Sequence, residues 1–298
     1  MIWRKLESGD VVGVVAPASS VTSERIRNGV TWLESLGYTV RLGETVGEQD
    51  RFLGGADADR ARDLGAMFAD DEVRAIFTAR GGYGSSRILD AVDYTNIRDH
   101  PKPFVGFSDT TAFQLGLYAR TGVPSLSGFV LATDAAEGPP SSDMASDVFG
   151  ALEGVFPDID GLEGEDMEGT LVGGCLTLIT HLIGTRYLPD LAGCLLFLED
   201  VGEAPYRIDR LLTQLLLANV LKAAAGVVVG AFHKCDGDGE DGTVEDVIDD
   251  FRGRCPCPVI TGLPYGHGPS RRVMPIGVHA QVLNGTITFR GRGVDGVV

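Results

Sequence analysis

The feature that most constrains this fold is the alternation of short apolar runs with amphipathic helical patterns in the first half of the chain. The predicted strands are 11–16, 39–42, 74–79 and 102–107, and the predicted helices are 24–36, 58–68 and 111–120. Apolar strands that alternate with helices are typical of βαβ units, whose parallel strands are covered on both faces. The sequence therefore predicts an α/β protein with an amino-terminal, Rossmann-like parallel sheet flanked by helices.

The composition changes between residues 134 and 168, where Asp, Glu, Gly, Pro and Ser accumulate and only 144–152 has a helical pattern. Such a stretch is typical of a linker between domains. Because the length suits two domains of ordinary size, we predict an amino-terminal domain over 1–133, a linker over 134–168 and a carboxyl-terminal domain over 169–298.

The carboxyl-terminal part has mixed signals. A Gly173-Gly174 turn precedes an apolar strand at 194–198, and a helix with apolar residues at helical spacing follows over 205–220. The tail at 278–290 alternates around Asn284-Gly285, which is a strong β-hairpin signal. We therefore expect a mixed α/β second domain.

The charge excludes several classes of partner. With 25 Lys and Arg against 42 Asp and Glu, the net charge is −17, so phosphate backbones and anionic lipids are repelled. We expect no nucleic-acid partner and no membrane partner. The lysines are few (Lys5, Lys102, Lys222 and Lys234), and an acidic, lysine-poor surface favours a halophilic protein over a merely acidic one.

The chain has no sign of export. Acidic residues follow closely on the amino terminus, before any apolar leader, and no run approaches the roughly 18 apolar residues of a membrane span. Five cysteines are an odd number, which does not suit a secreted disulfide framework: Cys175, Cys194, Cys235, Cys255 and Cys257. We therefore expect a cytoplasmic protein.

Ser108 is a candidate nucleophile because it lies where a buried strand turns into a helix. Such a turn exposes a hydroxyl beside free helix N–H groups, which can stabilise an oxyanion. Gly106 leaves room for a tight turn, although Asp109 and Thr110 differ from an α/β-hydrolase elbow. A serine that only caps the helix is the alternative.

The loop Arg80-Gly81-Gly82-Tyr83-Gly84 also follows a predicted strand. Its glycines could point backbone N–H groups into a cleft, or they could simply form a tight turn. The spacing does not match the GxGxxG fingerprint of dinucleotide-binding proteins.

Two further candidates lie in the second domain. Glu199 and Asp200 end the strand at 194–198, where α/β clefts open, and either carboxylate could orient an imidazole or cap the next helix. His267 lies in a glycine-flanked loop. A histidine of this kind could act as a base or could simply be solvated.

A metal site is a weaker alternative. One nitrogen and three sulfurs could bind zinc, but their spacings are tighter than usual for structural zinc: His233, Cys235, Cys255 and Cys257. The acidic loop at 236–246 is similar to a calcium loop in composition only. We expect no metal and no cofactor.

In their order along the chain, these segments resemble the LD-carboxypeptidases, whose relatives include the microcin C immunity peptidases. The resemblance covers about residues 10–290 and rests on VAPASS ending at Ser20, FLGG at 52–55 with Arg60 downstream, RGGYG at 80–84, GFSD at 106–109, GG at 173–174, LFLED at 196–200 with YRIDR at 206–210, and GH at 266–267 with PIG at 275–277.

The resemblance implies a serine peptidase with Ser108 as nucleophile, His267 as general base and Glu199 orienting the imidazole. The N–H groups of Asp109 and Gly82 would then form the oxyanion hole. The family also implies a small peptide substrate with an L,D-peptide bond and a homodimer. Four arginines near the motifs could bind the terminal carboxylate of such a substrate, with Arg80 and Arg271 preferred over Arg87 and Arg272.

Two departures from the family pattern leave the substrate open. Cys175 stands where Asn is expected, and Ser127-Gly128-Phe129 replaces His-Gly-Pro. The alternative substrates are peptidyl or aminoacyl sulfamoyl-adenylates, which would need an aromatic platform that Trp3 and Trp32 do not obviously supply. The other class that the sequence leaves open is a non-catalytic Rossmann-like or zinc-stabilised binding protein.

Overall fold

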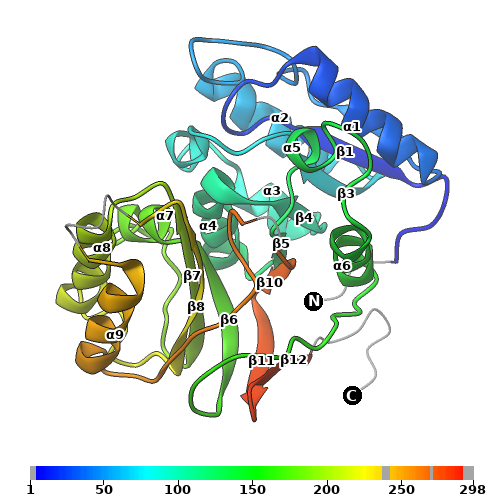
Figure 1. Ribbon diagram of the computed structural model, residues 1–298. Helices are drawn as coiled ribbons and strands as arrows, with labels where there is room; N and C mark the ends of the chain where they lie inside the picture. The colour runs from blue at the N-terminus through cyan, green and yellow to red at the C-terminus, as the bar shows by residue number, and fades with distance from the viewer. Residues whose placement is uncertain (1–4, 237–241, 269–270, 291–298) are drawn as a thin grey trace.

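The computed structural model describes residues 5–236, 242–268 and 271–290, which form two six-stranded sheets with helices packed against them (Figure 1). Most strand pairs in both sheets are parallel. The predicted α/β class is confirmed.

The first sheet has the strand order β10-β5-β4-β3-β1-β2. Its parallel strands are β1 (Val11–Val15), β2 (Thr39–Leu42), β3 (Val73–Thr78), β4 (Phe104–Gly106) and β5 (Ser125–Ser127). The edge strand β10 (Met274–Ile276) comes from far along the chain and pairs antiparallel with β5. The first sheet is therefore completed by a segment from the carboxyl-terminal part of the sequence.

Two groups of helices cover the first sheet. Strand residues alternate between its faces, so Val12 and Val14 pack with one group while Val15 and Ile76 pack with the other. The first group is α1 (Ser23–Ser35), α5 (Leu131–Asp134) and α6 (Ser142–Leu152). The second group is α2 (Asp57–Ala69), α3 (Tyr94–Asp99) and α4 (Thr111–Thr121).

The second sheet has the order β12-β11-β6-β7-β8-β9. Its strands are β6 (Met167–Cys175), β7 (Cys194–Val201), β8 (Gly226–His233), β9 (Val259–Ile260), β11 (Val278–Leu283) and β12 (Thr286–Arg290). The helices that follow its strands are α7 (Leu176–His181), α8 (Pro205–Leu217) and α9 (Val244–Arg254), with α8 and α9 side by side on its outer face (Figure 1).

The predicted elements of the first half agree with the structure within a few residues, and the predicted hairpin is formed by β11 and β12 around Asn284-Gly285. The predicted turn at Gly173-Gly174 is wrong, because both glycines lie within β6. A Cβ on Gly173 would lie 2.0 Å from the carbonyl oxygen of Phe197, and one on Gly174 would lie 2.5 Å from Thr111 Oγ1. These glycines allow close contacts inside a strand instead of ending one. The domain boundaries stay predictions.

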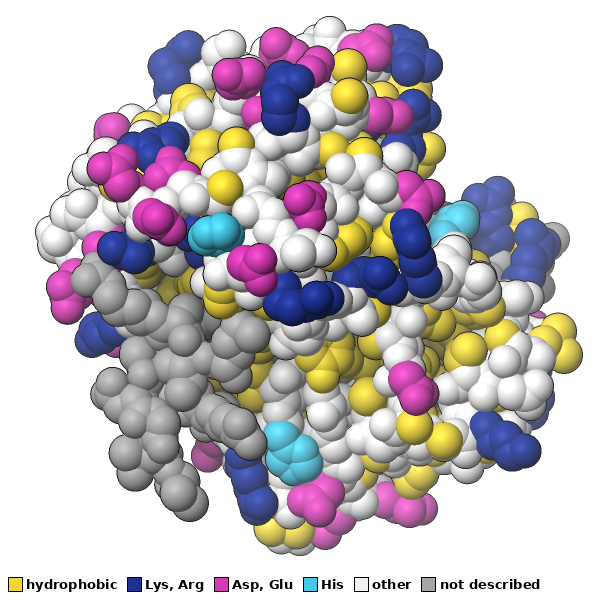
Figure 2. Space-filling view, turned by 180° about the vertical axis from the view of Figure 1, so that it is seen from behind, with side chains coloured by type: hydrophobic (Ala, Val, Ile, Leu, Met, Phe, Trp, Pro, Cys, Tyr) yellow, Lys and Arg dark blue, Asp and Glu magenta, His cyan; other side chains and the backbone are white. Residues whose placement is uncertain are grey.

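The surface carries charges of both signs. On the face seen in Figure 2, basic side chains lie among acidic ones and beside exposed apolar side chains. Within the described residues, no helix is long and apolar enough to cross a membrane.

Candidate active site between the two sheets

A chain of hydrogen bonds joins side chains from both sheets. The Nε2 atom of His267 lies 3.0 Å from Ser108 Oγ, and its Nδ1 atom lies 2.7 Å from Glu199 Oε2. The exposed fraction of the side chain is 21% for His267 and 0% for Glu199, so solvent reaches the imidazole but not the carboxylate. This is the arrangement that a base needs to accept a proton from a hydroxyl while a carboxylate orients it.

Ser108 is held in an uncommon backbone conformation. It follows β4, begins the short 3₁₀ helix η2 (Ser108–Thr110) and has a φ of 63°. A non-glycine residue in the left-handed region is strained and is often found at functional sites. This backbone conformation directs the hydroxyl toward His267. It also places the N–H of Asp109 in the first turn of a helix, where N–H groups lack intrahelical acceptors.

Glu199 fixes the imidazole through two contacts. Its Oε2 atom accepts a hydrogen bond from the backbone N–H of His267 at 3.2 Å, in addition to its contact with the ring. Burial raises the pKa of Glu199, and the hydrogen bonds from His267 oppose that rise. The other oxygen, Oε1, has no hydrogen-bond partner in the described part of the chain. The carboxylate is therefore stabilised mainly by the histidine that it orients.

Asp200, the other carboxylate predicted to be able to orient the base, lies elsewhere. Its Oδ2 atom accepts hydrogen bonds from the N–H and the hydroxyl of Thr177 at 2.9 and 2.8 Å, and its Oδ1 atom accepts one from Cys175 Sγ at 3.6 Å. Successive residues of β7 thus face two different sets of partners. Burial raises the pKa of Cys175, so the residue that departs from the family pattern is a neutral thiol beside the site.

The glycine loop contacts Ser108 directly. A Cβ on Gly81 would lie 3.0 Å from Ser108 Cβ and 3.3 Å from its Oγ, so any side chain there would crowd the hydroxyl. Gly82 has a φ of 99°, and its missing side chain faces Ser19. Within the described residues, no protein acceptor takes a hydrogen bond from the Gly82 N–H. Its role in an oxyanion hole stays a prediction.

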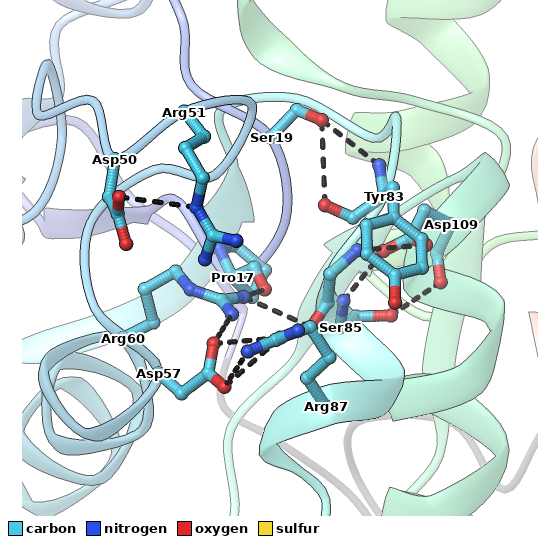
Figure 3. A network of polar contacts seen from close by, with 11 residues as sticks. Pro17, Ser19, Asp50, Arg51, Asp57, Arg60, Tyr83, Ser85, Arg87 and Asp109 are labelled. Atoms are coloured by element: carbon cyan, nitrogen blue, oxygen red, sulfur yellow. Dashed lines mark hydrogen bonds and ion pairs between the residues drawn. The ribbon is translucent and has the colours of Figure 1, made fainter.

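The carboxylate of Asp109 connects this loop to the turn that holds Ser108 (Figure 3). It accepts hydrogen bonds from the N–H of Gly84 at 3.2 Å and from the N–H of Ser85 at 2.8 Å. The hydroxyl of Ser85 in turn donates to the Asp109 carbonyl at 2.5 Å. Burial raises the pKa of Asp109, while these N–H donors lower it.

Arg60 lies under the same loop and is fully buried (Figure 3). Its guanidinium donates to the carbonyls of Pro17 and Gly84 and to the carboxylate of Asp57. Asp57 also accepts two hydrogen bonds at 3.0 Å from Nε of Arg87 and one at 2.6 Å from its Nη2. Sequence analysis noted Arg60 only as part of the family pattern, because the two carbonyls that it contacts lie 24 and 43 positions away.

The four arginines proposed for carboxylate binding differ in their partners. Three are already engaged: Arg87 with Asp57, Arg271 with Asp134, and Arg272 with Asp147. Arg80 is exposed, contacts the Ser20 carbonyl at 3.0 Å and makes no ion pair within the described residues. Its guanidinium is therefore the most available to a substrate.

Aromatic side chains pack around the imidazole, and the sequence did not indicate this role. The ring centroid of Phe107 lies 4.5 Å from that of His267, and the Arg271 guanidinium lies 4.5 Å from the Phe107 centroid. Tyr265 packs edge-on against Phe107 at 5.7 Å, and its hydroxyl lies 2.7 Å from Ser127 Oγ. The second departure from the family pattern, Ser127, thus contacts the aromatic wall behind the base.

The zinc alternative finds no support in the geometry. Within the part of the chain that the structure describes, no group of three or more His, Cys, Asp or Glu side chains is placed to hold a metal ion. Cys235 is buried and contacts the His233 carbonyl at 3.6 Å, whereas Cys255 and Cys257 contact each other. Residues 237–241 of the acidic loop lie outside the described residues.

Comparison with known proteins gives consistent matches over most of the chain. Residues 12–128 match the LD-carboxypeptidase N-terminal domain and residues 168–282 match the LD-carboxypeptidase C-terminal domain. A probable murein peptide carboxypeptidase of Bacillus subtilis is 36% identical over 93% of this chain and 90% of its own length. The microcin C7 self-immunity protein of Escherichia coli is 26% identical over 93% of this chain and 92% of its own length.

A solved structure also matches most of the chain. The muramoyltetrapeptide carboxypeptidase from Oxalobacter formigenes matches with a TM-score of 0.84 and 30% identity, over 94% of this chain and 97% of the other. The similarity therefore extends over both sheets and includes the segments that bring Ser108, Glu199 and His267 together.

Proposed function

This chain belongs to the LD-carboxypeptidase family of serine peptidases, and we propose that Ser108, His267 and Glu199 are its catalytic triad. The observation that carries the proposal is the continuous set of hydrogen bonds from Ser108 Oγ through both imidazole nitrogens to Glu199. A hydroxyl is a weak nucleophile until a base takes its proton, and the base works only in the tautomer that an acceptor at Nδ1 imposes.

The proposed reaction has two steps. His267 Nε2 takes the proton of Ser108 as Oγ attacks the carbonyl carbon, and the imidazolium then donates that proton to the leaving amine. Water, activated by the same nitrogen, hydrolyses the acyl-enzyme. The N–H of Asp109, together with one from the Gly81-Gly82 turn, would stabilise the negative oxygen of each tetrahedral intermediate.

We propose Arg80 as the group that binds the terminal carboxylate of the substrate. A carboxypeptidase must recognise a free carboxylate, and an arginine can do so with two parallel hydrogen bonds. Arg80 is exposed, directly precedes the Gly81 that contacts Ser108, and makes no ion pair within the described residues. Arg271 would instead support the site from behind Phe107.

The substrate that we favour is a peptide ending in an L,D-bond, as in the murein tetrapeptide carboxypeptidases to which the chain is similar. A sulfamoyl-adenylate is the second candidate, because the chain also resembles an immunity protein of that branch. Trp32 is buried against Phe129 and cannot stack on the adenine ring of such a substrate. Phe52 and Tyr83, however, are about half exposed, with ring centroids 5.6 Å apart, and Tyr83 lies in the glycine loop.

The test compares three substrates at equal concentration: a tetrapeptide ending in L-Lys-D-Ala, its terminal amide, and a peptidyl sulfamoyl-adenylate. We expect the free acid to be cleaved best and Arg80→Ala to raise its KM while leaving cleavage of the amide unchanged. Equal cleavage of acid and amide by the unmodified protein would contradict the role of Arg80. Cleavage of the adenylate alone would move the chain to the immunity branch, and Ser108→Ala supplies the background for each substrate.

A further inference from the structure

We propose that Cys255 and Cys257 form a redox-active dithiol that closes into an intramolecular disulfide by exchange with a low-molecular-weight disulfide. Their Sγ atoms lie 3.6 Å apart, which is sulfur–sulfur contact without a bond. The site is separate from the triad and does not depend on the proposed peptidase mechanism.

The position of the pair distinguishes it from the other cysteines. Cys255 follows the last residue of α9, and β9 begins two residues after Cys257. Both are half-buried, whereas the remaining three cysteines are buried. The pair also lines a hollow of about 550 Å³ that can admit a small molecule. A dissolved disulfide can therefore reach these two sulfurs.

The local backbone suits ring closure. A disulfide bond is about 2.05 Å long, so the two sulfurs need to approach by only about 1.5 Å. Pro256 lies between them and Pro258 follows, and each proline fixes its own φ, so little chain freedom is lost on closure. A ring that spans one residue is tight, which makes the disulfide readily reducible and the reaction reversible.

Cys255 is the residue expected to attack. Either sulfur could donate the hydrogen bond between the two. When Cys257 donates, this hydrogen bond lowers the pKa of Cys255 to about 7 and raises the pKa of Cys257, which burial raises further. Arg252 lines the same hollow and favours a thiolate there, whereas Glu163 and Glu165, which also line it, disfavour one. A lowered pKa beside a second thiol is the pattern of known exchange sites.

The exchange balances as follows. The Cys255 thiolate attacks one sulfur of the dissolved disulfide, so a mixed disulfide forms and one small thiolate leaves. Cys257 then loses its proton to solvent and attacks the Cys255 sulfur, which releases the second small thiolate. The protein loses two protons and two electrons, and one molecule of dissolved disulfide takes them up and is reduced to two thiols.

The test is a mass measurement on the whole protein after exposure to oxidised glutathione. The reduced protein is treated at mildly alkaline pH, quenched with acid, unfolded, alkylated with N-ethylmaleimide and digested with trypsin. Residues 255–271 form one tryptic peptide that contains both cysteines of the pair and no other cysteine. We expect this peptide to be lighter by two hydrogen atoms and free of maleimide, while the other three cysteines are alkylated, and dithiothreitol should reverse the change.

Single variants separate attack from closure. Cys257→Ser keeps the attacking thiol of Cys255 but cannot form the intramolecular disulfide, so a mixed disulfide with glutathione should accumulate. Cys255→Ser should react at least about tenfold more slowly, because the remaining thiol is largely protonated. Cys194→Ser, a buried cysteine in β7, is the matched control and should behave like the unmodified protein.

The measurement on the unmodified protein decides the proposal even if a variant folds poorly. A lasting mixed disulfide without the cross-link, or full alkylation of both cysteines after oxidant treatment, would overturn it. Stoichiometric metal bound to this pair in the purified protein would also overturn it in favour of a metal site.

Discussion

The proposed nucleophile, Ser108, and the proposed base, His267, are held in place by different kinds of contact. Ser108 lies on a strained turn whose partner loop is fixed by buried polar contacts within the first sheet, through Asp109 and Arg60. His267 lies on a loop that runs from the second sheet to the first, and its ring is held between Glu199 of β7 and Phe107 after β4.

The two halves of the site therefore depend on different parts of the molecule. The geometry around Ser108 is local to one sheet, so it should tolerate small changes in how the sheets pack. The distance from His267 to Ser108 depends on contacts from both sheets, so it should be sensitive to such changes.

The largest effect is expected from the triad itself. Ser108→Ala, His267→Ala and Glu199→Ala should each lower kcat/KM by about 10⁴ to 10⁶, and combining them should add little, because a triad acts as a unit. Steady-state kinetics and thermal unfolding of each variant provide the check. Activity close to that of the unmodified protein in Ser108→Ala would remove Ser108 as the nucleophile.

The next effect concerns the nucleophile side. Gly84 and Ser85 donate to different oxygens of Asp109, and Asp109→Asn replaces one of these oxygens with an NH₂ group. The loop beside Ser108 should therefore shift, and kcat should fall about 10- to 100-fold. Asp63→Asn is a matched control, since Asp63 is also buried in this domain and accepts from the N–H and hydroxyl of Thr45. Equal losses of kcat in the two variants would reduce Asp109 to a purely structural residue.

A smaller effect is expected on the base side. Phe107→Leu removes the ring that contacts the imidazole, so kcat should fall about three- to tenfold as the base loses its alignment. Phe104→Leu in the same segment removes a fully buried ring that packs on Phe68 and Phe113, away from the site. If Phe104→Leu lowers kcat as much as Phe107→Leu, the contact with His267 has no special role.

The smallest effect concerns salt. With a net charge of −17, repulsion across the surface should weaken as KCl rises to molar concentrations, where the Debye length is about 3 Å, so Tm should increase. Buried contacts are screened much less, so the difference in Tm between Asp109→Asn and the unmodified protein should stay constant. Thermal unfolding at several KCl concentrations measures both, and a flat Tm would argue against a salt-adapted surface.

Sequence reasoning located the parts of the site that short motifs carry. Ser108 follows a strand that an apolar run identifies, Glu199 lies near the carboxyl end of another strand, and the glycines around His267 indicate a loop. It missed what depends on contacts between distant segments, such as the hydrogen bond between Ser127 and Tyr265, which are 138 positions apart. It also missed β10, because three residues are too few for a periodic pattern, and β6, because its glycines indicated a turn.

The late strand β10 has a consequence for how the protein is made. On the ribosome, β5 is synthesised about 150 residues before β10, and the histidine loop lies just ahead of β10. At about 5 to 20 residues per second, the edge of β5 stays unpaired for about 8 to 30 s until β10 is synthesised. An unpaired strand edge is a site for wrong association, so a nascent chain should depend on chaperones during that interval. Because His267 is synthesised just before β10, the growing chain holds all three proposed catalytic groups only late in that interval.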